Sequence, residues 1–133
     1  MITLLTGKKG SGKTKKLIEL ANKAASESKG NVVVLEKGSK LTYDIAPAIR
    51  LINVDDYSVN GEAALQGFVC GILAGNYDIT DVFVDSTLKV INEEELDAFV
   101  TGLAPAAKDV NIVLLVSADD ADIPSSLTDY IAK

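Results

Sequence analysis

Histidine and tryptophan are absent from this chain of 133 residues, and cysteine and arginine each occur once. Without histidine, His-based acid–base catalysis and most zinc sites are excluded. A single cysteine, Cys70, excludes an internal disulfide and suits a reducing compartment. We interpret Cys70 as a core residue, because no activating base is identifiable beside it. Aromatic residues make up only 5% of the chain, which argues against stacking platforms for single-stranded nucleic acid.

Long hydrophobic runs are also missing. No apolar run approaches the roughly 18 residues that a membrane span requires, and the N-terminus lacks the basic and apolar regions of a signal peptide. We therefore expect a cytoplasmic protein without a membrane span. The net charge of −6 argues against a dominant nucleic-acid-binding surface. The charge is uneven, because residues 1–40 contain nine lysines and three glutamates whereas residues 41–133 are strongly acidic. This asymmetry favours an anion site near the N-terminus, or attraction between copies or to an acidic partner.

The most specific pattern lies in residues 2–14, ITLLTGKKGSGKT. Gly7, Gly12, Lys13 and Thr14 satisfy Gly-x-x-x-x-Gly-Lys-Ser/Thr, the Walker A or P-loop pattern, between an apolar run and a helical periodicity. Glycines let backbone N–H groups converge on phosphates at a helix N-terminus. Lys13 is expected to reach the β- and γ-phosphates and to act in catalysis, and Thr14 to supply a hydroxyl to Mg²⁺. The alternative is a glycine-rich turn with a chance lysine. The residues predicted to bind ATP or GTP are Gly7, Lys8, Lys9, Gly10, Ser11, Gly12, Lys13 and Thr14.

Hydrophobic periodicity predicts alternating strands and helices. Strands are expected at 2–6, 32–35, 49–54, 79–85 and 112–116. Helices are expected at 12–28, at 61–74 with Asn60 as N-cap, from a capping box at Asn92 and Glu95 to a stop at Pro105, and briefly after Pro124. This alternation predicts an α/β fold. We expect a three-layer αβα P-loop NTPase core with a mainly parallel sheet of about five strands, formed by residues 1–133 as one domain.

A carboxylate ends the fourth predicted strand. Asp85 in VFVDS would lie at the C-terminal edge of the sheet, where α/β folds bind ligands. We predict that Asp85 and Thr14 hold Mg²⁺, in the manner of a Walker B aspartate. The alternative is a cap or a strand-end turn. Asp81 is a weaker rival, because it lies near the opposite edge.

Residues 49–90, IRLINVDDYSVNGEAALQGFVCGILAGNYDITDVFVDSTLKV, resemble the corresponding stretch of RecA-like ATPases. The chain also resembles a family of short bacterial ATP-binding proteins that are often loosely labelled as related to the pilus-retraction ATPases. In many related ATPases a glutamate follows the Walker B aspartate, and here that position is Ser86. RecA-like proteins instead place a glutamate after the strand that follows the first helix, which implies Glu36 as the general base. A solvated strand-end glutamate is the alternative.

The resemblance implies further positions. Ser117 ends a strand expected between the first strand and the strand of Asp85, where a polar residue can sense the γ-phosphate or simply form a turn. An arginine finger could come only from Arg50, and in trans. Lys8, Lys9 and Lys89 are weaker substitutes. RecA-like ATPases commonly act as oligomers, so we expect a homo-oligomer or an unidentified protein partner.

Three functions fit these patterns. The leading one is a slow or partner-stimulated ATPase that hydrolyses Mg·ATP. A small nucleoside or metabolite kinase is the first alternative, although no acceptor pocket or arginine-rich lid is visible. A non-catalytic nucleotide-dependent switch is the second, and the absence of glutamate after Asp85 favours it over a fast enzyme. The guanine-selecting Asn/Thr-Lys-x-Asp pattern is missing, which favours ATP over GTP.

Overall fold

Five parallel strands form the centre of the molecule. The computed structural model describes residues 1–132. The strands pair in the order β1-β5-β4-β2-β3, and every neighbouring pair is parallel. Their bounds are β1 Ile2–Thr6, β2 Asn31–Glu36, β3 Arg50–Asn53, β4 Ile79–Val84 and β5 Asn111–Val116. This pairing confirms the predicted α/β class and the parallel five-stranded sheet. The continuous apolar runs of the sequence are typical of strands that are covered on both faces.

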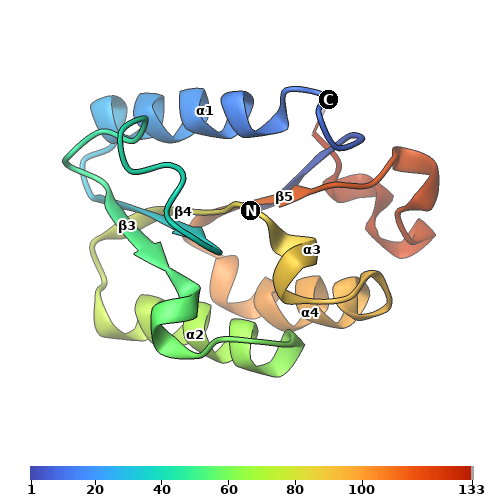
Figure 1. The fold of residues 1–133 in the computed structure, drawn as a ribbon. Coiled ribbons are helices and arrows are strands. Elements are labelled where there is room, and N and C mark those ends of the chain that lie inside the picture. The colour runs from blue at the N-terminus through green and yellow to red at the C-terminus, as the bar shows by residue number, and fades with distance from the viewer. Residues whose placement is uncertain (133) are drawn as a thin grey trace.

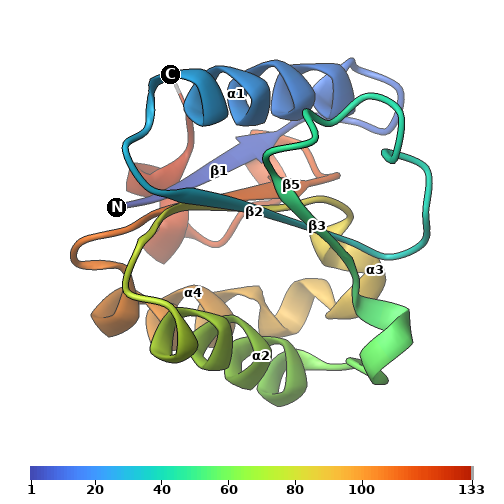
Figure 2. The same cartoon turned by 90° about the vertical axis from the view of Figure 1, so that its left-hand side faces the viewer.

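Helices cover both faces of the sheet. Helix α1 (Lys13–Glu27) lies over one face, and α2 (Glu62–Gly75) and α4 (Leu96–Leu103) lie over the other (Figures 1 and 2). A single short turn of helix, α3 (Thr87–Val90), follows β4. Within residues 1–132, no helix combines the length and the apolar character that crossing a membrane requires.

The predicted stripe of α1 explains how this helix packs. Leu17 and Ala21, one turn apart, are fully buried against Val34 and Phe83 of the sheet. The same face is completed by the segment 37–49, which has no regular structure. Its residues Leu41, Ile45 and Ile49 are buried in that core. Helix α1 and the anchored segment 37–49 therefore together cover this face of the sheet.

The two edges of the sheet differ. Strand β3 lies at one edge. Strand β1 lies at the other edge, where the chain returns before its C-terminus. There Ile131 forms a parallel bridge with Leu4, and the Ala132 N–H donates to the Leu4 carbonyl at 2.9 Å. The edge of β1 is thus partly paired, whereas β3 has no strand beyond it in residues 1–132.

Two expectations about helix starts need correction. Asn60 is not the N-cap of α2, because Gly61 takes that position with φ 90° and no side chain caps the helix. The Gly61 N–H donates to the Val90 carbonyl at 2.9 Å, and the helix begins one residue later than predicted. The capping box exists, with the Asn92 N–H donating to Glu95 Oε1 at 2.9 Å. It caps a 3₁₀ turn, Glu93–Glu95, that precedes α4.

Helix ends were predicted more accurately. Helix α4 stops two residues before Pro105, as expected, and the chain continues as a 3₁₀ turn, Ala104–Ala107. The short helix expected after Pro124 is also a 3₁₀ segment, Ser125–Tyr130. Helix α3 was not predicted, because four residues are too few to show a helical period. Cys70 is half-buried and packs against the core on the α2 side, as expected for a structural residue.

Candidate functional site

The Gly7–Thr14 loop connects β1 to α1 and depends on glycine at two positions. Gly12 is the N-cap of α1 in the left-handed region, with φ 87°. Gly7 has φ 144°, and a Cβ there would come within 2.6 Å of Ser11 Oγ. Any larger residue would strain the backbone or push Ser11 away. The sequence therefore fixes a tight turn directly before the helix.

The N-terminus of α1 has an electrostatic arrangement that is unusual for a helix. Its first intrahelical bond runs from Lys16 N to Gly12 O at 3.1 Å, which leaves the N–H groups of Lys13, Thr14 and Lys15 without intrahelical acceptors. No side chain caps this end, and the first turn contains no acidic residue. Lysines at the positive end of a helix dipole are unfavourable by themselves. The arrangement is suited to an anion, which would satisfy both the amides and the lysines.

Lys13 folds back over the loop. Only 8% of this lysine is exposed. Its Nζ donates to the Lys8 carbonyl at 2.6 Å and to Ser11 Oγ at 3.4 Å. The ammonium group is thus held by neutral oxygens of the loop itself, and no carboxylate of residues 1–132 pairs with it.

Side-chain alternation brings the ends of four strands to the face that α1 covers. One core residue from each strand lies under α1: Leu5, Val34, Phe83 and Leu115. Because side chains alternate along a strand, the residues two positions further share that face. These are Gly7, Glu36, Asp85 and Ser117. The loop and the three polar residues therefore meet at the C-terminal edge of the sheet.

A cavity of about 530 Å³ opens at this edge. The loop contributes Lys9, Gly10, Gly12, Lys13 and Thr14 to its lining. Other polar residues that line it are Lys40, Asp85, Ser86, Lys89 and Ser117. The structure thus brings five of the predicted loop residues together with Asp85 and Ser117.

Asp85 is half-buried at the end of β4. Its N–H donates to the Leu35 carbonyl at 2.8 Å, which extends the β2–β4 pairing by one residue. Its Oδ2 accepts a hydrogen bond from Ser86 Oγ at 3.0 Å. Ser86 has φ 61°, a left-handed conformation that is uncommon for serine and turns the chain sharply into α3. The Asp85 carboxylate consequently lies at the wall of the cavity.

Glu36 lies beside Asp85 and is only 3% exposed, so the solvated alternative is wrong. Its Oε1 accepts hydrogen bonds from Lys40 N at 2.9 Å and Leu41 N at 3.3 Å. The second carboxylate oxygen, Oε2, accepts no hydrogen bond from residues 1–132. Burial raises the pKa of Glu36, the two amide bonds oppose this, and the nearby Asp85 carboxylate adds to the rise.

The remaining predicted loop residues lie outside this cavity. Gly7 and Ser11 line a smaller hollow on the other side of the loop. Lys8 extends away, and its Nζ lies 3.8 Å from a carboxylate oxygen of Asp119. Glu36 does not line the cavity either, although it adjoins Asp85. Arg50 lies at the opposite edge of the sheet, beside the first residues of β2 and β4.

The donor set can be tested for its fit to a metal. No group of three or more Asp, Glu, His or Cys side chains in residues 1–132 converges on one point. Thr14 and Asp85 offer a hydroxyl and a carboxylate at one cavity. Mg²⁺ prefers oxygen ligands and commonly uses one or two protein oxygens together with phosphates and waters. The residues present therefore fit Mg²⁺ bound together with a phosphate ligand, and not a metal held by the protein alone.

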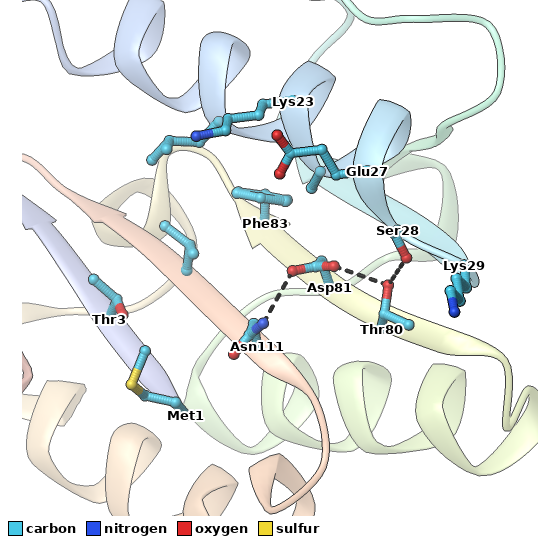
Figure 3. A pocket seen from close by; sticks show the side chains of 13 residues that line it. Met1, Thr3, Lys23, Glu27, Ser28, Lys29, Thr80, Asp81, Phe83 and Asn111 are labelled. Carbon is cyan, nitrogen blue, oxygen red and sulfur yellow. Dashed lines mark hydrogen bonds between the residues drawn. The ribbon is translucent and has the colours of Figure 1, made fainter.

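Asp81, the rival of Asp85, lies in a different cavity. This second cavity, of about 500 Å³, lies between α1 and the beginnings of β1, β5 and β4 (Figure 3). Asp81 accepts hydrogen bonds from Asn111 Nδ2 at 3.3 Å and Thr80 Oγ1 at 2.8 Å (Figure 3). The expectation that Asp81 lies at the edge opposite the loop is confirmed.

Lys40 lines the cavity, although no pattern in the sequence predicts a role for it. Its segment shows no periodicity, and its proximity to Asp85 depends on the fold. The one available signal is its position shortly after a strand that ends at the C-terminal edge of a parallel sheet.

Comparison with protein-family models gives no match, and comparison with curated proteins gives none either.

Proposed function

We propose that the chain is a P-loop protein that binds Mg·ATP at the Gly7–Thr14 loop. The observation that carries this proposal is the cavity in which Lys13 and Thr14 face Asp85. One wall is the uncapped, lysine-rich N-terminus of a 15-residue helix, and the other carries a single carboxylate. Anions favour the first wall, and a metal cation favours the second. A metal-bound phosphate chain satisfies both.

Each residue then has a chemical role. The N–H groups at the start of α1 and the Lys13 ammonium would bind phosphate oxygens. The Thr14 hydroxyl and the Asp85 carboxylate would hold Mg²⁺, which supplies positive charge to the phosphate oxygens. Lys13 would exchange its bond to the Lys8 carbonyl for a charge-assisted bond to phosphate, which is stronger.

The order of the strands supports a RecA-like relationship. The resemblance implies that one strand lies between the loop strand and the strand of the metal-binding aspartate. In the sheet, β5 lies between β1 and β4. This position brings Ser117 to the cavity, where its hydroxyl could contact the terminal phosphate.

We further propose slow hydrolysis with Glu36 as the base. A water oxygen would bond to the γ-phosphorus while the bond to the β–γ bridging oxygen breaks. ADP leaves with the bonding electrons, and the water proton passes to Glu36. Two observations favour a low rate. Ser86 occupies the place of a glutamate directly after Asp85, and one oxygen of Glu36 is already committed to two amides.

Calorimetric titration of ATP with Mg²⁺ tests the proposal. We expect wild type to bind ATP, and Lys13→Ala to weaken it by about 10- to 100-fold, the loss of one charge-assisted contact. Lys23→Ala is the matched control, because Lys23 lies on the same helix and lines the other cavity. Failure of the folded wild type to bind ATP or GTP would refute the proposal.

Phosphate release distinguishes the functional alternatives. Release from ATP alone, abolished by Lys13→Ala, supports the hydrolase. Binding without release indicates a switch, and ADP formation that requires an added nucleoside indicates a kinase. Competition with GTP tests the preference for ATP.

A further inference from the structure

Two lysines outside the loop line the same cavity as Lys13. Lys40 comes from the segment after β2, and Lys89 comes from α3, directly after β4. We propose that Lys40 and Lys89 form a cationic subsite for the terminal phosphate of the bound nucleotide, supplied by the same chain. This inference rests on the proposed function and specifies which part of the nucleotide these residues recognise.

The backbone at Lys40 is fixed from its buried side. Glu36 Oε1 accepts a hydrogen bond from Lys40 N at 2.9 Å, and the next residue, Leu41, is buried in the core under α1. Earlier in the segment, the Gly38 N–H donates to Asn53 Oδ1 at 2.9 Å. The backbone of Lys40 is therefore held in place, although its side chain is exposed.

The rest of the segment is fastened to α1. Asn22 Nδ2 donates to the Asp44 carbonyl at 3.0 Å, and Asn22 Oδ1 accepts from Ala46 N at 2.9 Å. One side chain thus holds the segment by a donor and an acceptor, and Ile45 between them is buried. These contacts reduce the entropy that Lys40 would lose on binding.

The position of Lys89 is fixed by the short helix α3. Its neighbours Thr87 and Val90 are buried, and its N–H donates to the Ser86 carbonyl at 2.9 Å. Lys89 follows Asp85 by four residues, so the predicted metal ligand and this ammonium lie on one continuous segment. Together, Lys40 and Lys89 approach the cavity from two elements other than the loop.

The charges of the cavity favour a ligand with more negative charge than a diphosphate alone. Its lining contains four lysines (Lys9, Lys13, Lys40 and Lys89) and one carboxylate, Asp85. Neither Lys40 nor Lys89 forms an ion pair with another residue of the described chain. The γ-phosphate is the group that distinguishes ATP from ADP, and it carries the charge that changes most during phosphoryl transfer.

The only arginine cannot take this role in its own chain. Arg50 is exposed at the start of β3, near Asn31 and Ile79, which begin β2 and β4. That is the edge of the sheet opposite the cavity. Lysines are weaker than arginine for bidentate contacts but serve as point charges toward phosphate. Lys40 and Lys89 thus add two cations to those of the loop, from elements that follow β2 and β4.

The test compares the affinities for Mg·ATP and Mg·ADP of wild type, Lys40→Gln, Lys89→Gln and the double variant. We expect each single variant to lower ATP affinity by about five- to tenfold, and the double variant by about 30-fold or more, while ADP affinity changes less than about twofold. Lys23→Gln changes the charge equally on the other side of the molecule and should leave both affinities unchanged. Lys40→Arg should retain most of the ATP affinity.

The outcomes separate the two proposals. Equal losses for ATP and ADP would mean general charge attraction and would overturn the subsite, as would no loss for either nucleotide. Wild type that binds neither nucleotide would refute the proposed function itself, and the subsite with it. Both lysines are exposed, so thermal melting is expected to show intact folding in every variant.

Discussion

Among the cavities of the described chain, two have nearly equal volumes and lie beside α1 at opposite edges of the sheet. The cavity at the C-terminal edge has a volume of about 530 Å³ and contains Asp85, and the cavity at the N-terminal edge has about 500 Å³ and contains Asp81. Each is therefore lined by residues of α1 and by one aspartate, which is Asp81 within β4 or Asp85 directly after it. Size alone does not distinguish them.

The two aspartates differ in what already binds them. Asp81 accepts hydrogen bonds through both carboxylate oxygens, from Asn111 and from Thr80, and Thr80 is also bonded to Ser28 (Figure 3). Asp85 accepts one bond, from the hydroxyl of the adjacent Ser86. Both oxygens of Asp81 are thus engaged by neighbouring side chains, whereas Asp85 Oδ1 accepts no hydrogen bond from the described residues and leaves more capacity for a ligand.

The two ends of α1 differ in the same way. At its C-terminus, the Ser28 N–H donates to the Ala24 carbonyl, and the Ser28 hydroxyl accepts a hydrogen bond from Gly30 N, so this end has a side chain that takes part in local hydrogen bonds. At its N-terminus, lysines stand where acidic side chains are normally preferred. A local rule broken at a cavity indicates function more strongly than the volume of the cavity does.

Of the changes that test this comparison, Asp85→Asn should have the largest effect on nucleotide affinity. We expect Mg·ATP affinity to fall by about 10- to 100-fold, because a charged oxygen ligand is replaced by a neutral one. The loss should shrink when EDTA replaces Mg²⁺, since the carboxylate acts through the metal. Titration calorimetry in both buffers measures it. An equal loss in EDTA would contradict metal binding by Asp85.

Changes at Glu36 should separate its structural role from its proposed chemical role. Glu36→Ala leaves the N–H groups of Lys40 and Leu41 without their acceptor, so we expect unfolding free energy to fall by about 1–3 kcal/mol. Glu36→Gln retains an oxygen acceptor and should remain folded. It should bind ATP like wild type but release little phosphate. Unchanged turnover would remove Glu36 from the mechanism.

The raised pKa of Glu36 gives this comparison a pH dependence with a defined sign. The folded state binds the Glu36 proton more tightly than the unfolded state, so this group favours folding at low pH and the benefit is lost as pH rises through the raised pKa. Glu36→Gln should therefore be more stable than wild type near pH 7, and the difference should shrink in acid. Turnover requires the ionised carboxylate of Glu36. As the pH is lowered, the rate should therefore begin to fall at a higher pH than it would with a glutamate of ordinary pKa. Urea titrations and rate profiles across pH measure both effects.

Sequence periodicity was sufficient for the sheet and for the location of the loop. The apolar runs of β1 and β5 and the stripe of α1 are local signals, and they predicted elements to within a few residues. The strand-end positions of Asp85 and Asp81 then followed from parallel pairing, whereas the position of Ser117 was implied by the resemblance to RecA-like ATPases. All three lie where expected.

Burial and loop contacts could not be predicted in the same way. Glu36 resembles a solvated strand end in sequence, and its burial depends on the turn at Lys40 and Leu41 folding over it. Lys40 reaches the cavity because Asn22, on a different element, fastens its segment. Such contacts link residues that share no local pattern. The short helix α3 is likewise determined by Ser86 and its burial, not by propensity.

The smallest effect is expected from Asp81→Asn, the matched partner of Asp85→Asn. Asp81 is half-buried and receives two hydrogen bonds from neutral donors, so we expect unfolding free energy to fall by no more than about 1 kcal/mol. Affinity for Mg·ATP should equal that of wild type, because the loop lies at the other edge. Urea unfolding and the same calorimetric titration measure the two quantities. A loss of ATP affinity as large as that of Asp85→Asn would indicate that the nucleotide responds equally to both edges. In that case, the hydrogen bonds that already engage Asp81 would not be a valid reason to prefer the cavity of Asp85 as the nucleotide site.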